Sequence, residues 1–174
     1  LPYKGKTIIE KVIDNITYSE IDNIIVVLGA YKDEILKVIE PYRISHCYND
    51  IYREGMLTSV KCGFSSLPQQ FGAAVIFLGD QPMISQGVIN TITEAFKKSG
   101  KGIIVPVFNN TRGHPVLISR KYSDEIKKTD NSSGLRHLIK KFETDVLEVS
   151  VNSSEILRDI DTEEDYRNEI NLIN

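Results

Sequence analysis

The chain has 174 residues, of which 41% are hydrophobic and 26% are charged, and its formal net charge is −3. Such a composition is ordinary for a soluble globular protein, and the length suits one domain with a substantial core. No basic face is evident, which argues against nucleic acid as the main partner. No apolar run approaches the ~18 residues of a membrane span, and the start of the chain lacks a signal-peptide pattern. We therefore expect a cytoplasmic protein that acts away from membranes.

Two cysteines, Cys47 and Cys62, bear on the redox compartment. Their spacing matches no metal-ligand motif, so it does not indicate a zinc site. Free thiols are typical of proteins in a reducing compartment. We expect both cysteines to be free, with a disulfide between them as the alternative.

Helical and strand patterns alternate along most of the chain. Apolar residues at helical spacing predict helices over residues 8–16, 31–39, 57–67, 86–98, 122–127, 134–142 and 163–170. Mainly apolar runs predict strands over residues 24–28, 73–78, 103–107, 115–118 and 146–149, and a short, polar-interrupted pattern predicts another over residues 44–48. The alternation predicts an α/β fold, with a mainly parallel sheet and helices on both faces. A turn at Asn109 and Asn110 predicts a hairpin, which makes the sheet mixed.

An acidic residue follows the longest of the apolar strand patterns. Residues 73–78 are all apolar and predict a buried strand that ends at Gly79 and Asp80. Ligands of open α/β sheets bind at the carboxyl ends of strands. Asp80, stiffened by Pro82, is therefore the strongest candidate for holding a divalent cation against a substrate's phosphates. The alternative is a turn in which the carboxylate accepts backbone N–H groups.

Two acids near the C-terminus are candidates for the same cation site. If this stretch is extended, Ile160 points to one side and both Asp159 and Asp161 point to the other. The two carboxylates would then form a metal site together with Asp80. Alternatively, Asp161 only stabilises the start of a helix that Thr162 caps.

The segment Arg112–Pro115 lies in a turn that opens a strand. Gly113 allows the backbone to approach a ligand closely, and His114 can donate a hydrogen bond to a phosphate or a ring. The alternative is an ordinary hairpin loop in which Arg112 and His114 are solvated.

Two polar turns each precede a predicted helix. Residues 131–136 would expose N–H groups to an anion, with Arg136 adding a bidentate phosphate contact. Gly55 opens the helix that contains Met56 and Ser59, whose first turn also offers free N–H groups. In both cases the alternative is a helix start with nothing bound.

Together and in this order, the segments resemble the molybdenum cofactor cytidylyltransferases. These enzymes belong to the nucleotidyltransferases similar to the guanylyltransferase of molybdopterin guanine dinucleotide synthesis. The resemblance spans nearly the whole chain and rests on Leu1–Thr7, Gly55–Ser59, Gly79–Pro82, Arg112–Pro115, Gly134–Arg136 and Asp159–Asp165. It implies a single nucleotidyltransferase domain, residues 1–174, with a three-layer Rossmann-like fold. It also implies an enzyme in which a terminal phosphate of molybdopterin attacks the α-phosphorus of CTP and pyrophosphate leaves.

The resemblance further implies a role for each segment. Asp80 and Asp161 would be catalytic and would hold Mg²⁺, or alternatively Mn²⁺, with Asp159 as the other candidate for the second carboxylate. The residues implied for nucleotide binding are Gly55, Met56, Ser59, Gly79 and Asp80. The residues implied for molybdopterin binding are Arg112, His114 and Arg136. An apo-molybdoenzyme that receives the product is the implied protein partner. The sequence leaves the oligomeric state open, and we expect a monomer by default.

The chain departs from the family pattern at its start. Family members begin with a strand and a glycine-rich loop, directly before the stretch that corresponds to Leu1–Lys6. That loop binds the triphosphate through backbone N–H groups and supplies an arginine and a lysine. We expect the natural protein to have an upstream segment that carries this first strand and loop, and we expect the chain without it to be inactive.

Two other functions remain open from the sequence. One is a related transferase that uses GTP or activates a sugar phosphate, although Gln81 after Asp80 favours the cytidine branch by resemblance. The other is a non-catalytic protein that binds a nucleotide or molybdopterin. Pyrophosphate release from CTP would separate the enzymes from the binding protein.

Overall fold

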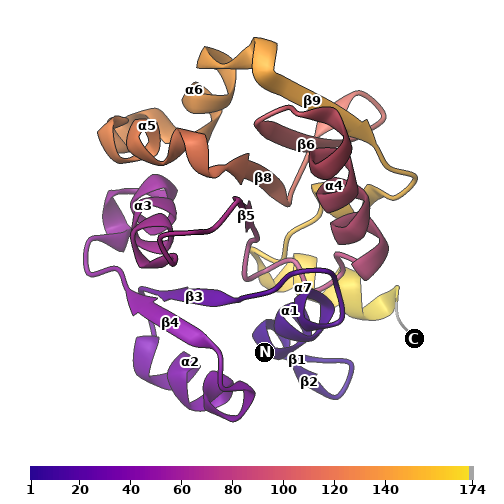
Figure 1. Cartoon of the computed structure of the whole chain (residues 1–174). Coiled ribbons are helices and arrows are strands. Elements are labelled where there is room, and N and C mark those ends of the chain that lie inside the picture. Colours follow the sequence, from indigo (N-terminus) through magenta and orange to yellow (C-terminus); the bar gives the residue numbers. More distant parts are fainter. Residues whose placement is uncertain (173–174) are drawn as a thin grey trace.

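A computed structural model describes residues 1–172 of the chain (Figure 1). The helices are α1 (Ile8–Thr17), α2 (Lys32–Ile39), α3 (Met56–Ser66), α4 (Gln86–Ser99), α5 (Ser123–Lys128), α6 (Gly134–Lys141) and α7 (Glu163–Asn171). The strands are β1 (Pro2–Tyr3), β2 (Lys6–Thr7), β3 (Ile25–Leu28), β4 (Ser45–Tyr48), β5 (Ala73–Ile76), β6 (Ile103–Phe108), β7 (Thr111–Arg112), β8 (Val116–Ser119) and β9 (Val146–Ser150). Short 3-10 turns connect several of these elements, among them Asn131–Ser133 before α6. The predicted alternation of strands and helices is confirmed.

The main sheet is mixed, as predicted. Strand β8 pairs antiparallel with both β5 and β6, while β6 pairs parallel with β9. Strands β5, β6 and β9 therefore share one direction, and β8 runs against them. The predicted hairpin is present, and the short strand β7 pairs with the end of β6. A separate parallel pair joins β3 to β4.

Helices cover both faces of this sheet because its inner strands are apolar on both sides. In β6, Ile103 and Val105 pack with α3, α5 and α6, whereas Ile104 packs with α1 and α4. In β8, Val116 and Ile118 contact the first group of helices, and Leu117 contacts the second. Figure 1 shows α5 and α6 on one side of β6 and β8, with α4 on the other. This alternation produces the three-layer α/β fold.

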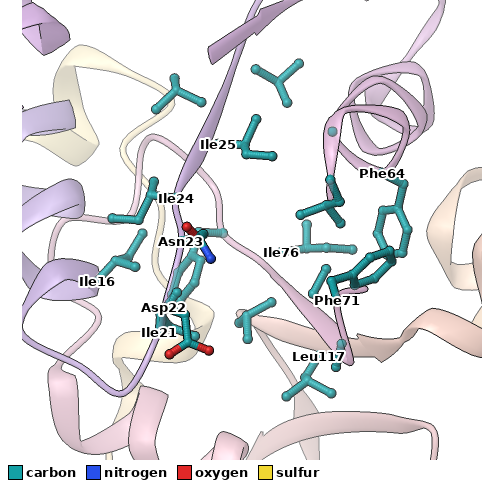
Figure 2. Close-up of a pocket in the computed structure, with 18 of the residues that line it drawn as sticks. Ile16, Ile21, Asp22, Asn23, Ile24, Ile25, Phe64, Phe71, Ile76 and Leu117 are labelled. Atoms are coloured by element: carbon teal, nitrogen blue, oxygen red, sulfur yellow. The ribbon is translucent and has the colours of Figure 1, made fainter. Parts of the chain in front are cut away.

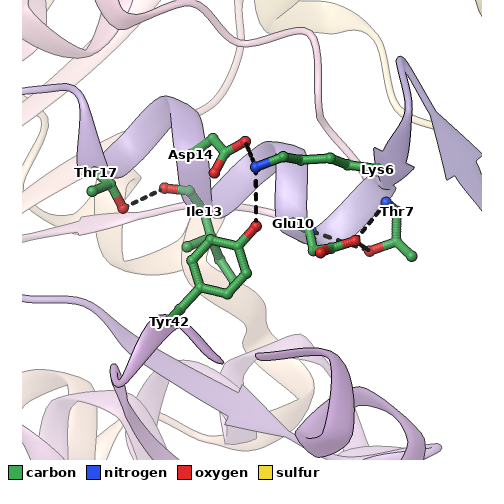
Figure 3. Close-up of polar contacts among 7 residues, drawn as sticks. All are labelled: Lys6, Thr7, Glu10, Ile13, Asp14, Thr17 and Tyr42. Carbon is green, nitrogen blue, oxygen red and sulfur yellow. Dashed lines mark hydrogen bonds and ion pairs between the residues drawn. The ribbon is translucent and has the colours of Figure 1, made fainter. Parts of the chain in front are cut away.

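Local chemistry fixes the start of α1. Thr7 accepts a hydrogen bond from the N–H of Glu10, whose carboxylate in turn accepts from the N–H of Thr7 (Figure 3). This capping box satisfies N–H groups that the first helical turn would otherwise leave free. Figure 3 also shows the Lys6 ammonium between Asp14, at 2.7 Å, and the Tyr42 hydroxyl. These two contacts raise the pKa of Lys6 to about 12 and connect α1 to the turn after α2.

Strand β5 departs from one prediction. All four of its residues are half-buried, so the prediction of a buried strand is wrong in this respect, and the strand ends at Ile76. The physical reason lies at its edge. Within residues 1–172, β5 pairs only with β8 and β3 pairs only with β4, which leaves one edge of each strand unpaired. Both strands line the same cavity.

Within residues 1–172, no helix combines the length and the apolar character needed to cross a membrane.

Candidate functional site

Three loops meet beyond the carboxyl end of β5. The backbone N–H of Ile160 donates to the carbonyl of Asp80 at 3.1 Å, and the N–H of His114 donates to the carbonyl of Ile156 at 3.0 Å. A Cβ atom at Gly113 would lie 2.2 Å from the Ile156 carbonyl oxygen, so only glycine allows this approach. Backbone contacts therefore bring together the segments around Asp80, His114 and the two acids near residue 160.

The carboxylate of Asp80 lacks a protein partner on one oxygen. Among the described residues, its buried Oδ1 atom has no hydrogen-bond partner. Burial raises the pKa of Asp80 above its ordinary value, and the negative charges of Asp161 and Asp159 raise it further. A buried carboxylate oxygen without a partner is costly unless a cation or another donor satisfies it. A backbone hydrogen bond at Asp80 itself lowers this pKa in turn, so the carboxylate is partly satisfied by its own turn and keeps Oδ1 without a partner among the described residues.

The acidic segment has the alternation that the sequence predicts. Ile160 is buried at 9% relative exposure, whereas Asp159 and Asp161 are exposed. Thr162 caps α7 in a capping box, with its hydroxyl accepting from the N–H of Asp165. The helix-cap alternative is therefore confirmed for Thr162, and the two acids lie outside the core, while their role as metal ligands stays a prediction.

An ion pair holds this acidic segment against the rest of the molecule. The Arg158 guanidinium donates to Oε2 of the buried Glu169 at 2.8 Å, and the Tyr3 hydroxyl donates to its Oε1 at 2.9 Å. Tyr166 adds a hydrogen bond from its hydroxyl to the carbonyl of Pro2 at 2.6 Å. Sequence reasoning missed Arg158 and Glu169, because no local pattern connects residues so distant from Tyr3.

The carboxylates of Asp80, Asp159 and Asp161 suit a metal ion that takes most of its ligands from water and substrate phosphates. In the residues that the structure describes, no three His, Cys, Asp or Glu side chains form a ready-made metal site. Magnesium commonly binds through one or two carboxylates and completes its shell with water and substrate phosphates. The unpartnered oxygen of Asp80, with Asp161 and Asp159 close enough to raise its pKa, fits that pattern.

The surroundings of His114, at the neighbouring loop, disfavour its protonated form. Burial lowers the pKa of His114, the positive charge of Arg136 lowers it further, and the charge of Asp159 opposes both. The His114 imidazole is therefore neutral at neutral pH, with one nitrogen free to donate and the other to accept. Arg136 itself is exposed in the first turn of α6.

The guanidinium of Arg112 is already paired with two glutamate side chains of this chain. It forms ion pairs with Glu143 and with Glu148, the latter in β9, and these contacts raise its pKa. A role of Arg112 in substrate binding remains a prediction, and it would require these surface pairs to open.

The predicted nucleotide segment begins α3 at a second edge of the site. Gly55 has a positive φ of 115° at the helix N-cap, and Met56 is exposed. The side-chain amide of the buried Asn49 donates to Thr58 at 2.8 Å and to Ser59 at 3.0 Å. Asn49 therefore fixes the first turn of α3. Sequence reasoning missed it, although an asparagine directly after the predicted strand over residues 44–48 was a usable signal.

An apolar cavity of about 780 Å³ lies between β3 and β5 (Figure 2). Its lining comes from both strands and from helices α1 and α3, and it includes Met56, Ser59 and Gly79. Figure 2 shows Ile24 and Ile25 on one side of the cavity, with Phe64, Phe71 and Ile76 on the other. Three of the residues predicted for nucleotide binding thus line one space, and Asp80 follows directly at its edge.

The fold and the site together define an α/β protein with acidic residues gathered beyond the carboxyl end of β5. The MobA-like NTP transferase domain family matches residues 1–146, so the chain belongs to this family of nucleotidyltransferases. The predicted family resemblance and the α/β fold class are confirmed.

Individual relatives agree with this assignment. The molybdenum cofactor cytidylyltransferase of Escherichia coli K12 is 26% identical over 167 residues, which are 95% of this chain and 83% of that protein. The bifunctional protein GlmU of Clostridium kluyveri is 26% identical over 76% of this chain, and the match spans 29% of that protein. The crystal structure of Rv0371c from Mycobacterium tuberculosis, in complex with manganese, superposes with a TM-score of 0.83 at 22% identity, covering 97% of this chain and 88% of that one. The last match establishes a shared fold.

Proposed function

We propose that this protein is a CTP:molybdopterin cytidylyltransferase, which transfers CMP to the molybdenum cofactor and releases pyrophosphate. The observation that carries the proposal is the buried, unpartnered Oδ1 of Asp80 at a strand end, with Asp161 and Asp159 beside it. The similarity to the cytidylyltransferase of E. coli over 95% of the chain supports the choice of CTP and molybdopterin as substrates.

In this proposal each part of the site has one task. Asp80, with Asp161 or Asp159, holds a divalent cation, either Mg²⁺ or Mn²⁺. When bound, the cation neutralises charge on the triphosphate and on the leaving pyrophosphate. The manganese in the complex of the M. tuberculosis protein supports a cation at this fold, without choosing between the two metals. Gly55, Met56, Ser59 and Gly79 contact the nucleotide.

The reaction requires positioning rather than a covalent residue. A phosphate oxygen of molybdopterin attacks the α-phosphorus of CTP, one P–O bond forms, and the bond to pyrophosphate breaks. His114 and Arg136 face the molybdopterin side, where neutral His114 donates a hydrogen bond and Arg136 supplies positive charge to the phosphate. Arg112 would join them only after release from Glu143 and Glu148.

We further propose that residues 1–174 belong to one nucleotidyltransferase domain whose sheet takes another strand between β3 and β5. The support is physical: both strands leave an edge unpaired, and both edges line the 780 Å³ cavity. Unpaired strand edges beside apolar side chains favour the addition of a strand. The source we propose is a segment upstream of Leu1. The expected result is slower amide exchange in β3 and β5 when the chain carries the residues its gene encodes upstream. Unchanged exchange would contradict the proposal.

The proposed setting follows from the same activity. The enzyme would act as a cytoplasmic monomer on two small molecules, with no nucleic acid or membrane partner, and would pass its product to an apo-molybdoenzyme.

Pyrophosphate release tests the activity. The chain, extended by whatever its gene encodes upstream of Leu1, is incubated with molybdopterin, Mg²⁺ and one of CTP, GTP, ATP or UTP. We expect release with CTP and a fall of at least ~100-fold in Asp80→Asn, because charge stabilisation by a single group contributes about that much. Asp124→Asn, an exposed acid of α5, is the matched control and should keep full activity.

A second candidate is a sugar-phosphate nucleotidyltransferase or a GTP-dependent relative, for which the similarity to GlmU is the supporting observation. Release of pyrophosphate with a sugar 1-phosphate, but not with molybdopterin, would favour it. Binding of CTP without any release would favour a non-catalytic binding protein.

A further inference from the structure

Two thiols meet beside the proposed nucleotide segment. Cys47 lies in β4 and Cys62 lies in α3, 15 positions apart, and the Sγ of Cys62 donates to the Sγ of Cys47 at 3.1 Å. The Cys62 thiol also lies 3.4 Å from the carbonyl oxygen of Tyr48. Both side chains are half-buried, so neither sulfur is sealed inside the core.

The contact requires little movement to become a bond. A disulfide has an S–S distance of about 2.05 Å, so the sulfurs need to approach by about 1 Å. Helix α3 packs directly against β4, as Figure 1 shows, and Asn49 already ties the two elements together through Thr58. The geometry is therefore preset for an internal bond rather than for reaction with another chain.

We propose that Cys47 and Cys62 form a reversible dithiol–disulfide site, oxidised by a small-molecule disulfide such as glutathione disulfide. The Cys47 thiolate attacks the oxidant, which forms a mixed disulfide at Cys47 and releases one glutathione thiolate. Cys62 then loses its proton and attacks the Cys47 sulfur, which releases the second glutathione. Two thiols are oxidised, one glutathione disulfide is reduced, and the two protons end on the released thiols.

The surroundings support this order of attack. Burial and the hydrogen bond to Cys47 raise the pKa of Cys62 to about 12, and the negative charge of Asp50 contributes in the same direction. The Tyr48 carbonyl oxygen, 3.4 Å from the Cys62 sulfur, is an acceptor that also favours the protonated thiol, so Cys62 is the resolving thiol in the proposed order. In the second, intramolecular step, the proximity of the two sulfurs compensates for the small fraction of Cys62 that is deprotonated.

The bond would close a loop that contains the first turn of α3. Asn49, Gly55, Met56 and Ser59 all lie between the two cysteines. Oxidation would covalently hold this turn against β4. An effect on nucleotide binding rests on the proposed function, whereas disulfide formation itself does not.

Mass spectrometry of the oxidised protein is the direct test. The chain is incubated with glutathione disulfide at pH 8, free thiols are alkylated, and the intact and digested protein is weighed. We expect the loss of two hydrogens, a cross-linked peptide pair that contains Cys47 and Cys62, and full reversal by a reducing agent. We also expect Tm to rise by roughly 5–10 °C, because the crosslink restricts the unfolded chain.

Two variants test whether the disulfide depends on the positions of the two cysteines rather than on the reactivity of their thiols alone. Cys62→Ser should stop at one glutathione on Cys47. The double variant Cys62→Ser/Ser66→Cys keeps two thiols but moves one of them a helical turn along α3, and it should give only glutathione adducts. Two glutathione adducts or crosslinked dimers in the unmodified protein, without an internal disulfide, would overturn the proposal. If the disulfide forms but CTP binding is unchanged, the proposed dithiol–disulfide site stands, and only its effect on nucleotide binding is refuted.

Discussion

The N–H of Ile160 donates to the carbonyl of Asp80 at 3.1 Å, which joins two loops that lie 80 residues apart in the chain. The bond aligns the backbone of the acidic segment with the end of β5. The side chain of Ile160 enters the core, so Asp159 and Asp161 stay outside, where their charges raise the pKa of Asp80. One backbone contact thus combines a half-buried acid with two exposed ones.

Without bound metal, the Asp80 carboxylate should lower the free energy of unfolding at neutral pH. Its pKa is raised in the folded state, so its favourable contribution is present below the unfolded pKa of about 4 and is lost as the pH rises through the folded value. Asp80→Asn should therefore raise the free energy of unfolding at pH 7 by about 0.5–1 kcal/mol, with solvent screening limiting the gain. Urea unfolding at pH 7 and pH 4 measures it. A larger gain at pH 4 than at pH 7 would refute this account.

His114 should make the fold sensitive to mild acid. Its pKa is lowered in the folded state by burial and by Arg136, so below about pH 6.5 the unfolded chain binds the additional proton. Stability should fall as the pH drops from 7.5 to 5, and His114→Gln should remove up to about 1 kcal/mol of that fall. His137→Gln, an exposed neighbour in α6, is the control. Equal slopes in the two variants would contradict the prediction.

Glu169 should hold the C-terminal helix and the acidic segment in place. Glu169→Gln removes the charge that pairs with Arg158 and weakens the acceptor of the Tyr3 hydroxyl. We expect a loss of about 1–3 kcal/mol in the free energy of unfolding, because the pair is partly buried. Glu163→Gln breaks an exposed pair with Arg167 in the same helix and should cost less than about 0.5 kcal/mol. Denaturant unfolding of both variants measures the difference.

Gly113 should tolerate no side chain. A Cβ there would lie 2.2 Å from the Ile156 carbonyl oxygen, so Gly113→Ala must push two loops of the site apart. The expected cost is about 2 kcal/mol or more. Gly72→Ala adds the same methyl group where no atom lies within 4 Å and should change stability little. Thermal unfolding compares the two, and similar Tm values would show that the loops are not in close contact.

Local patterns allowed most of the fold to be predicted. Thr7 and Thr162 cap their helices because their partners, Glu10 and Asp165, are three residues away. The exposure of Asp159 and Asp161 on either side of a buried Ile160 also follows from alternation alone. The alternation therefore predicted which side chains of the acidic segment are exposed, although no local pattern sets the distance of this segment from Asp80.

Tertiary contacts explain what could not be predicted. The bond between Tyr3 and Glu169 joins residues 166 positions apart. The ion pairs of Arg112 with Glu143 and Glu148 depend on β6, which pairs with β7 at one edge and with β9 at the other. The half-exposed state of β5 reflects an open strand edge, which the apolar composition of Ala73–Ile76 could not reveal.

Nucleotide binding by way of Asp80 is the central claim, and calorimetric titration with CTP and Mn²⁺ measures it most directly. The chain is used with any residues that its gene encodes upstream of Leu1, beside the variants Asp80→Asn and Asp124→Asn. We predict metal-dependent binding of CTP that Asp124→Asn retains and Asp80→Asn weakens at least ~10-fold, an energy of about 1.4 kcal/mol. Equal affinity in the two variants would contradict the assignment of Asp80 as the residue that holds the cation.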